Sequence, residues 1–273
     1  MSGPAVLLNQ QPQLGFAPYS FFAQPTIQGR SGTKLKLKDG LLLIYCFCKQ
    51  LGSSKTQELC GFSSETVADW FNYCREVCIT ALRNAPQMGG PGQVVQADES
   101  FLRGRRKYNR HRMMAGNSVG PARQNYGNNV VGPWVFGMVC RRADGTQDVR
   151  LFSVLRRNRQ TLRPIIQQHV AAGTTICTDE WRAYGGRDGI AAWGQYMHRT
   201  VNHSVNFVAA DGTNTQRIET HWGHLKTKLL RDMRGVRGHF LPGYLAAYWW
   251  FAQHKQTPFL DFLVEIRRQF PLG

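Results

Sequence analysis

Residues 93–98, QVVQAD, form a short run of strand-forming residues that ends in the carboxylate of Asp98. Residues 174–179, TTICTD, have the same form and end in Asp179, 81 residues further along the chain (179 − 98 = 81). A strand that is followed by a carboxylate is typical of α/β sheets, which expose functional groups at the C-terminal ends of their strands. The two runs therefore predict two strands of one α/β sheet, each with an acidic side chain at its functional edge.

The segments around these runs complete a mixed sheet flanked by helices. Residues 134–140 and 149–155 are two further strand candidates, joined by a turn at 143–145. Apolar spacings of three and four predict helices, and Pro258 after Thr257 is a favoured helix start. The predicted helices cover residues 162–170, 215–233, 241–254 and 258–269. This order of elements favours an antiparallel meander of three strands with a fourth strand added in parallel.

The chain before the sheet has a different pattern. Residues 1–33 have the composition of a loosely ordered tail, although their aromatic residues could also form a docking strip. Residues 34–88 are helical in pattern, with a short helix, a turn at Gly61 and a longer amphipathic helix capped at its start by serine. This arrangement suggests a helix-turn-helix, with Arg75 on the polar side of the longer helix. Before the charge is considered, a plain three-helix packing unit fits equally well. Residues 87–92 are a predicted linker, and residues 89–273 form the predicted catalytic domain.

The charge and the cysteines narrow the class of protein. The 273 residues carry a formal net charge of +17, so the chain is attracted to polyanions, although an acidic protein or an anionic membrane surface would also satisfy the charge. No apolar run approaches the roughly 20 residues that span a bilayer, and no secretory signal opens the sequence. Seven cysteines, an odd number in a long chain, favour core thiols in a reducing compartment over a disulfide framework.

A third acidic residue, Glu219, lies on the helix predicted to begin near Thr215, and Asp211 competes with it for this role. If Asp98, Asp179 and Glu219 converge, their charges repel one another unless divalent cations lie between them. Mg²⁺ prefers oxygen ligands, and two such ions about 4 Å apart serve phosphoryl transfer. The alternative is that the two aspartates cap their strands and Glu219 is a solvated helix residue.

Basic residues near these carboxylates are candidates for phosphate contacts. Lys226 follows Glu219 by two helical turns on the same face, although an ordinary surface lysine would look the same. The segment 103–112 holds six Lys/Arg in ten residues, which favours DNA contact over a solvated loop or a nuclear-import signal. The predicted DNA-binding residues are Arg75, Arg103, Arg105, Arg106, Lys107, Arg110 and Lys226. His198 and His203 are possible metal ligands, but a structural role is favoured for both because no cysteine pair with zinc spacing lies near them.

Longer strings of the sequence resemble those of the Merlin-type DDE transposases, which are eukaryotic cut-and-paste elements with relatives among bacterial insertion sequences. The strings are GGPGQVVQADESFLRGRRKYNR, WVFGMV, TLRPIIQQHVAAGTTICTDEWRAY, HRTVNHSVNF and TQRIETHWGHLK, in this order, with WFNYCREVC before them. The similarity covers roughly three quarters of the chain. Many relatives also carry a cysteine-based zinc ribbon, whereas residues 1–45 contain no cysteine.

The resemblance implies a ribonuclease-H-like catalytic domain whose acidic triad matches Asp98, Asp179 and Glu219, with Lys226 as the basic residue that follows. It implies two Mg²⁺ or Mn²⁺ ions that are held by the triad. It also implies that the partner is double-stranded DNA, namely the terminal inverted repeats and the target. It also implies a homo-oligomer in the synaptic complex, and location in the nucleus of a eukaryotic host or with cytoplasmic DNA otherwise.

The resulting hypothesis is a transposase that hydrolyses a phosphodiester at the element's end and joins the freed 3′-hydroxyl to target DNA. Two rivals remain: a domesticated DNA-binding protein with idle carboxylates, and a nuclease of the same fold that cleaves without end specificity or joining.

Overall fold

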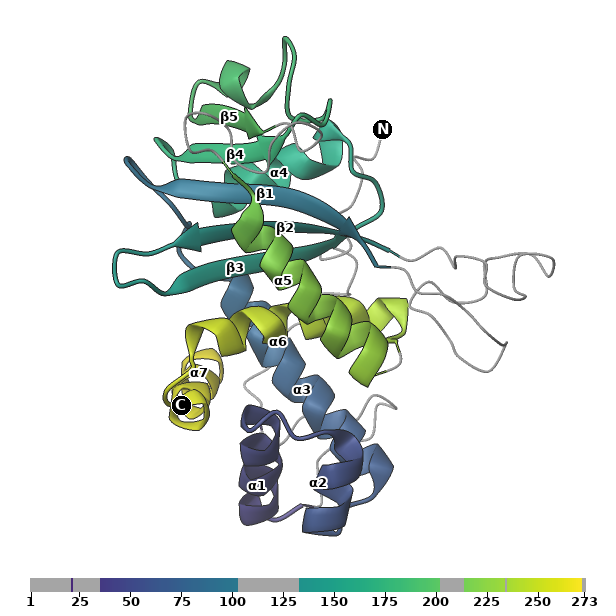
Figure 1. Ribbon diagram of the computed structural model, residues 1–273. Coiled ribbons are helices and arrows are strands. Elements are labelled where there is room, and N and C mark those ends of the chain that lie inside the picture. Colours follow the sequence, from purple (N-terminus) through teal and green to yellow (C-terminus); the bar gives the residue numbers. More distant parts are fainter. Residues whose placement is uncertain (1–20, 22–34, 103–132, 202–213, 234, 272–273) are drawn as a thin grey trace, which may run out of the picture. The chain divides into compact units, whose positions relative to one another are not determined.

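Figure 1 shows the computed structural model of the chain, which describes residues 21, 35–102, 133–201, 214–233 and 235–271. The chain divides into two compact units. The sheet unit runs from Pro86 to Leu245, and the helical unit combines the described residues up to Ala85 with those from Ala246 onward. The contacts thus group the last two helices, from Ala246, with the helical unit, whereas the sequence had placed them with the sheet.

The sheet unit is built on a five-stranded mixed sheet with the strand order β3-β2-β1-β4-β5. The strands are β1 (Val94–Phe101), β2 (Trp134–Arg141), β3 (Gln147–Val154), β4 (Thr175–Asp179) and β5 (Met197–Val201). The first three strands pair antiparallel, β4 pairs parallel with β1, and β5 pairs parallel with β4. This confirms the predicted ribonuclease-H-like sheet, an antiparallel meander extended by parallel strands.

Three local predictions in this unit were wrong. Strand β1 does not end at Asp98 but continues to Phe101, because polar side chains in its second half find partners on helix α5 and in the turn after β4. Strand β5 was missed, since most of its side chains are exposed and it lacks an apolar pattern. The predicted linker instead packs against the sheet unit: Met88 is buried and forms a parallel bridge with Val170.

Helices cover both faces of the sheet. Helix α5 (Gln216–Lys226) runs across one face in Figure 1 and continues into a π-helical stretch, η5 (Thr227–Asp232). Helix α4 (Arg159–His169) packs on the opposite face, where the ring of His169 stacks on Phe152 of β3. Two short 3₁₀ helices, η4 (Ile190–Trp193) and η6 (Gly238–Phe240), complete the unit together with the first turn of α6 (Leu241–Gln253).

A buried ionic cluster joins β3 to α4. The guanidinium of Arg150, 1% exposed, donates from Nε and Nη2 to the carboxylate of Asp148 at 3.2 and 2.9 Å. Its Nη1 lies 3.1 Å from Nδ1 of His169. Because an arginine can only donate, Nδ1 of His169 accepts this bond and the imidazole is neutral. Burial, together with the charge of Arg150, lowers the pKa of His169 to about 4.

The helical unit consists of α1 (Leu37–Cys48), α2 (Ser53–Cys60), α3 (Ser64–Arg83), the remainder of α6 and α7 (Pro258–Gln269). The caps are as predicted: Gly61 ends α2 in the left-handed region at φ 72°, and Ser63 accepts a hydrogen bond from the amide of Thr66. The ring of Phe47 contacts the rings of three other phenylalanines, which form the core of this unit: Phe71, Phe251 and Phe262.

The predicted tail lies outside the described residues except for Phe21, which is buried against Trp70 and Phe270. The seven cysteines are free, and six of them are buried. Across the described ranges, no helix has the length and apolar character needed to cross a membrane.

The neutral state of His169 predicts a loss of stability in mild acid. The folded pKa is about 4 and the unfolded value is near 6.5, so between these values the unfolded chain binds more protons and stability falls as the pH is lowered. His169→Asn keeps an acceptor for Arg150 without titrating. From pH 7.5 to 4.5 the wild type should lose roughly 2 to 3 kcal/mol more free energy of unfolding than the variant, measured by urea titration. Equal losses in both proteins would contradict a neutral buried imidazole.

Candidate active site

The parallel pairing of β1 with β4 sets the relation between Asp98 and Asp179. Val94, Val95 and Gln96 pair with Thr175, Ile176 and Cys177, so partners differ by 81 positions (175 − 94 = 81). The two aspartates are separated by the same 81 positions. Continuing the register two residues beyond the last observed pair therefore places Asp98 level with Asp179 on neighbouring strands. Because side chains alternate along a strand, both belong to the same face as Gln96.

Helix α5 brings Glu219 to this same face. The amides of Arg217 and Ile218 donate to Oε1 of Gln96 at 3.0 and 3.4 Å, so the start of the helix rests on β1. Glu219 follows directly, is exposed to solvent, and accepts a hydrogen bond from the hydroxyl of Thr215 at 3.2 Å. The three predicted carboxylates thus come from β1, β4 and α5 on one side of the sheet.

The carboxylate of Asp98 is held by the indole of Trp222, whose Nε1 donates to Oδ2 at 2.8 Å. The close approach of the indole depends on Gly137, which pairs with Asp98 across β1 and β2. A Cβ atom at Gly137 would lie 2.5 Å from the ring of Trp222 and 2.8 Å from Ile218. A glycine at this place in β2 is therefore a condition for α5 to lie against the sheet.

The charges at this site repel one another. Burial raises the pKa of Asp98 above its usual range, the hydrogen bond from Trp222 opposes the rise, and the charges of Asp179 and Glu219 add to it. Asp98 therefore lies within electrostatic reach of the other two carboxylates. The carboxylate of Asp179 also accepts a hydrogen bond from the amide of Trp181 at 3.0 Å, which ties it to the turn after β4.

A fourth acidic residue, Glu99, was not identified from the sequence. It is the next residue along β1 and therefore lies on the opposite face, where it accepts a hydrogen bond from the buried hydroxyl of Tyr184. Burial raises the pKa of Glu99 to about 8. The guanidinium of Arg157, whose charge opposes this rise, lies between the rings of Trp134 and Trp181, at 4.4 and 3.8 Å from their centroids. The signal for Glu99 in the sequence is the string ADES, in which two acidic residues are adjacent in a strand. Adjacent side chains point to opposite faces of the sheet, so Glu99 needs a partner other than that of Asp98.

Over the described residues, no group of three or more His, Cys, Asp or Glu side chains closes around a possible metal position. The three carboxylates are nevertheless a donor set of the kind that Mg²⁺ accepts, all oxygen and strongly negative. His198 takes no part in this set: its Nε2 lies 3.0 Å from the hydroxyl of Thr178, and its place in β5 puts it on the face opposite to Asp179. His203 lies outside the described residues.

The predicted DNA-binding residues fall into three groups. Lys226 is the last residue of α5 and is partly exposed, two helical turns beyond Glu219. Arg103, Arg105, Arg106, Lys107 and Arg110 lie outside the described residues. The prediction that Arg75 is exposed on the polar side of its helix was wrong, because Arg75 is only 9% exposed and its guanidinium bonds the side chain of Asn72.

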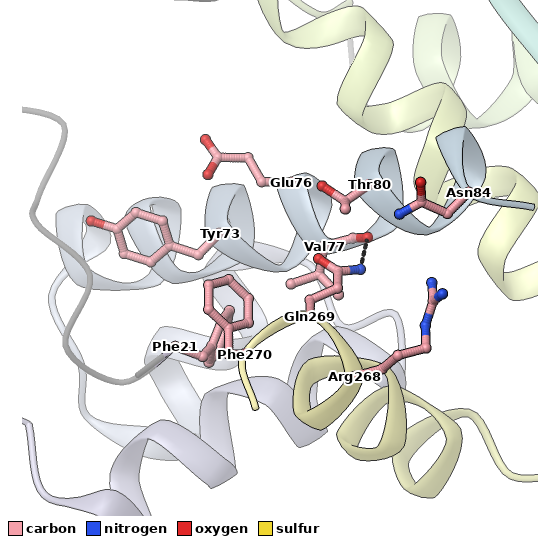
Figure 2. Close-up of a pocket in the computed structure, with 9 residues that line it drawn as sticks. All are labelled: Phe21, Tyr73, Glu76, Val77, Thr80, Asn84, Arg268, Gln269 and Phe270. Carbon is pink, nitrogen blue, oxygen red and sulfur yellow. Dashed lines mark hydrogen bonds between the residues drawn. The ribbon is translucent and has the colours of Figure 1, made fainter. Parts of the chain in front are cut away.

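The helical unit has a hollow of its own, of about 350 Å³, between α3 and the end of α7 (Figure 2). Figure 2 shows Gln269 donating to the carbonyl of Val77 along one side, at 2.9 Å. Glu76 supplies the one carboxylate among the residues that line it, and none of the predicted site residues contributes. The hollow lacks the acidic cluster that the proposed chemistry needs.

The strand order and the acidic residues on the two central strands, β1 and β4, define a ribonuclease-H-like domain. Residues 89–251 match the family described as the ISXO2-like transposase domain, which spans more than half of the chain. The chain therefore belongs to this transposase family. The match contains Asp98, Asp179, Glu219 and Lys226, whereas helices α1 to α3 lie outside it.

No curated protein shows significant sequence similarity to the chain. Among solved structures, the intasome of simian T-cell lymphotropic virus in complex with PP2A regulatory subunit B56 gamma matches at 16% identity and a TM-score of 0.29, covering 85% of this chain and 69% of that one. A pre-cleavage Mos1 transpososome matches at 10% identity and 0.31, covering 89% and 82%. The Mos1 strand transfer complex matches at 11% and 0.28, covering 89% and 81%.

The burial of Asp98, together with the charges of Asp179 and Glu219, predicts that removing the charge of Asp98 stabilises the metal-free protein. Because the folded-state pKa of Asp98 is raised, its ionised form weakens the fold at pH 7, and Asp98→Asn removes that charge while keeping an acceptor for Trp222. The variant should melt at a higher temperature than the wild type in buffer with EDTA.

Asp144→Asn is the matched control with the opposite sign. Hydrogen bonds from the hydroxyl and amide of Thr146 lower the pKa of Asp144, so its ionised form favours the fold and its loss should lower the melting temperature. Calorimetry of the three proteins in one buffer compares them directly. A lower melting temperature for Asp98→Asn would mean that the ionised carboxylate of Asp98 does not destabilise the metal-free fold.

Proposed function

We propose that this transposase-family protein is an active DDE transposase that cleaves the DNA strand at its element's end and joins the freed 3′-hydroxyl to target DNA. The observation that carries the proposal is the register of β1 and β4, which, continued by two residues, supports Asp98 level with Asp179 on the face that α5 covers. All three positions lie inside the family match. Membership of the Merlin-type branch belongs to the same proposal and is supported by the sequence strings given above.

The donor set fits divalent cations of the Mg²⁺ or Mn²⁺ type. Burial raises the pKa of Asp98, and the charges of Asp179 and Glu219 add to the rise, so bound positive charge would favour the ionised form of Asp98. In this proposal Asp98, Asp179 and Glu219 hold two ions. When bound, such ions supply Lewis acidity and neutralise the charge that develops on the phosphodiester oxygens.

The chain's own residues position the reacting groups. Trp222 donates to one oxygen of Asp98, and the hydroxyl of Thr215 donates to one oxygen of Glu219. Lys226, two turns further along α5, is placed to hold a DNA phosphate beside the carboxylates. The basic segment with Arg103, Arg105, Arg106, Lys107 and Arg110 follows β1 in the chain and is proposed to neutralise the phosphate backbone.

Recognition of the terminal inverted repeats is assigned to residues 34–88. Support comes from α2, the turn at Gly61 and the well-capped α3, an order of elements that matches a helix-turn-helix. The loss of Arg75 as an exposed contact leaves other side chains of α3 to read the DNA. Synapsis by a homo-oligomer and location in the nucleus of a eukaryotic host complete the proposal.

Replacing Glu219 tests the chemistry. Glu219→Gln keeps the size of the side chain and one acceptor oxygen but removes the charge, and the exposed position predicts a change in stability within about 0.5 kcal/mol. Losing a residue that only supports a metal ligand costs up to about 100-fold in activity. Because Glu219 is proposed to be a ligand itself, cleavage and strand transfer of a pre-nicked end substrate should fall by more than that, in Mg²⁺ and in Mn²⁺.

Asp211→Asn, the change at the competing carboxylate, is the control and should cleave normally. Loss of activity in that variant alone would reassign the third carboxylate. DNA binding by the wild type without Mg²⁺-dependent cleavage would favour a domesticated binding protein, and cleavage without joining would favour a nuclease.

The affinity for DNA should be mostly electrostatic. Each phosphate that is neutralised contributes about −0.9 to the slope of log K against log salt. Replacing Arg105, Arg106 and Lys107 by alanine should therefore flatten the slope by about three units. Fluorescence anisotropy between 50 and 300 mM KCl measures it, and an unchanged slope would remove this segment from the DNA interface.

A further inference from the structure

Helix α5 is attached to strand β1 at two points, four residues apart on the helix and two residues apart on the strand. The first point is Gln96, whose Oε1 accepts from the amides of Arg217 and Ile218. The second is Asp98, which accepts from Nε1 of Trp222. Both strand residues lie on the face that α5 covers, and Glu219 lies on the helix between the two points.

The first attachment replaces a helix cap. The first amides of a helix need acceptors from outside it, and they are usually satisfied by the side chain of the N-cap residue. The N-cap residue here, Thr215, makes no such bond, and its hydroxyl is directed to Glu219 instead. Gln96 takes over the capping role from the sheet. It is 2% exposed, and its Nε2 donates to Asn214 at 2.9 Å, so both ends of its amide are fixed.

The second attachment is fixed by packing as well as by the hydrogen bond. Trp222 is buried, and its ring lies over Gly137, where even one extra carbon atom would collide with it. The indole N–H therefore has little freedom to turn away from Asp98. A hydrogen bond between a neutral donor and a carboxylate inside such a site is stronger than an ordinary one and defines the orientation of the carboxylate.

We propose that Gln96 and Trp222 are positioning residues that hold Glu219 and Asp98 at a fixed separation, so that the acidic site is organised before any cation binds. The inference rests on the proposed function, because it concerns the carboxylates assigned there. Its physical reason is that repelling carboxylates would otherwise move apart, and the two attachments oppose this movement at both ends of the helix segment that carries Glu219.

Trp222→Phe tests the second attachment, because phenylalanine keeps an aromatic ring over Gly137 and lacks the N–H. Trp193→Phe is the matched control: its Nε1 donates to the carbonyl of Asp188 at 2.9 Å, remote from the carboxylates in sequence and outside the site. Mn²⁺ binding, measured by electron paramagnetic resonance on the full-length protein, should weaken 10- to 100-fold in Trp222→Phe and stay unchanged in Trp193→Phe. The turnover number should fall while the KM for DNA stays the same.

Gln96→Met tests the first attachment independently if the tryptophan variant does not fold. Methionine matches glutamine in length but accepts no strong hydrogen bond, so the amides of Arg217 and Ile218 should exchange with solvent at least about tenfold faster and Mn²⁺ affinity should fall. Gln87→Met is its control, because the side chain of Gln87 donates to the carbonyls of Gln167 and Gln168 on α4.

The outcomes separate this inference from the proposed function. If the wild type binds no Mn²⁺ and cleaves no DNA, the proposed function is wrong. If the wild type does both, and Trp222→Phe and Gln96→Met behave like their controls in metal affinity and amide exchange, the positioning roles are overturned while the function stands. Weaker metal binding with unchanged melting temperature in either variant supports the inference.

Discussion

The parallel pairing between β1 and β4 is the constraint on which the site depends. A parallel ladder fixes the offset between two strands, here at 81 positions, and a slip by one residue would turn Asp98 or Asp179 to the other face of the sheet. The crossover through α4 makes this pairing possible, since parallel neighbours need a long connection. The buried cluster of Asp148, Arg150 and His169 anchors that crossover helix to β3, on the face of the sheet opposite to Asp98 and Asp179. The same sheet therefore carries both the buried ionic cluster and the residues of the acidic site.

The central strand of the sheet, β1, carries polar residues whose burial costs free energy, and hydrogen bonds to distant parts of the chain offset this cost. In β1, Gln96, Asp98 and Glu99 would each be expensive to bury alone. Their partners are Asn214, Trp222 and Tyr184, which lie 118, 124 and 85 positions away in the chain. Every one of these bonds is long-range, so the strand can extend through its acidic residues only when α5 and the turn after β4 are in place. Folding of the sheet and assembly of the acidic face are one event in this arrangement.

Local signals in the sequence predicted local structure well. Ser63 as a cap, Gly61 as a helix end and Pro258 as a helix start lie where the residue types indicated, because each acts within a few positions of itself. The wrong predictions have a common cause, because each concerns residues whose environment is set by partners that are distant in the sequence. The sequence pattern ended β1 at the first carboxylate, since nothing nearby reveals the indole that satisfies it. Arg75 has a charged side chain yet is buried, and the segment 87–92 looks like a linker although Met88 packs into the sheet unit. The three carboxylates were predicted from two strand ends, a helix and the resemblance to DDE transposases. Gln96, Trp222 and Gly137, by contrast, give no such signal in the sequence, because their contacts to one another and to Asp98 are formed only in the fold.

The helical unit contains segments from before and after the sheet unit, and this determines which fragments could separate the proposed DNA recognition from the proposed catalysis. Helix α7 comes after the family match, and its buried residue Phe262 contacts Phe47 of α1, while Gln269 bonds the backbone of α3. A fragment that starts at residue 89 and keeps α7 would therefore expose an apolar face that α1 and α3 cover in the full chain, and its failure would say nothing about DNA recognition. The segment from Pro86 to Leu245 follows the compact unit instead and keeps Asp98, Asp179, Glu219, Gln96 and Trp222 together. Because α1 and α3 pack against α7, the unit proposed to read DNA is formed from segments on both sides of the sheet unit in the sequence.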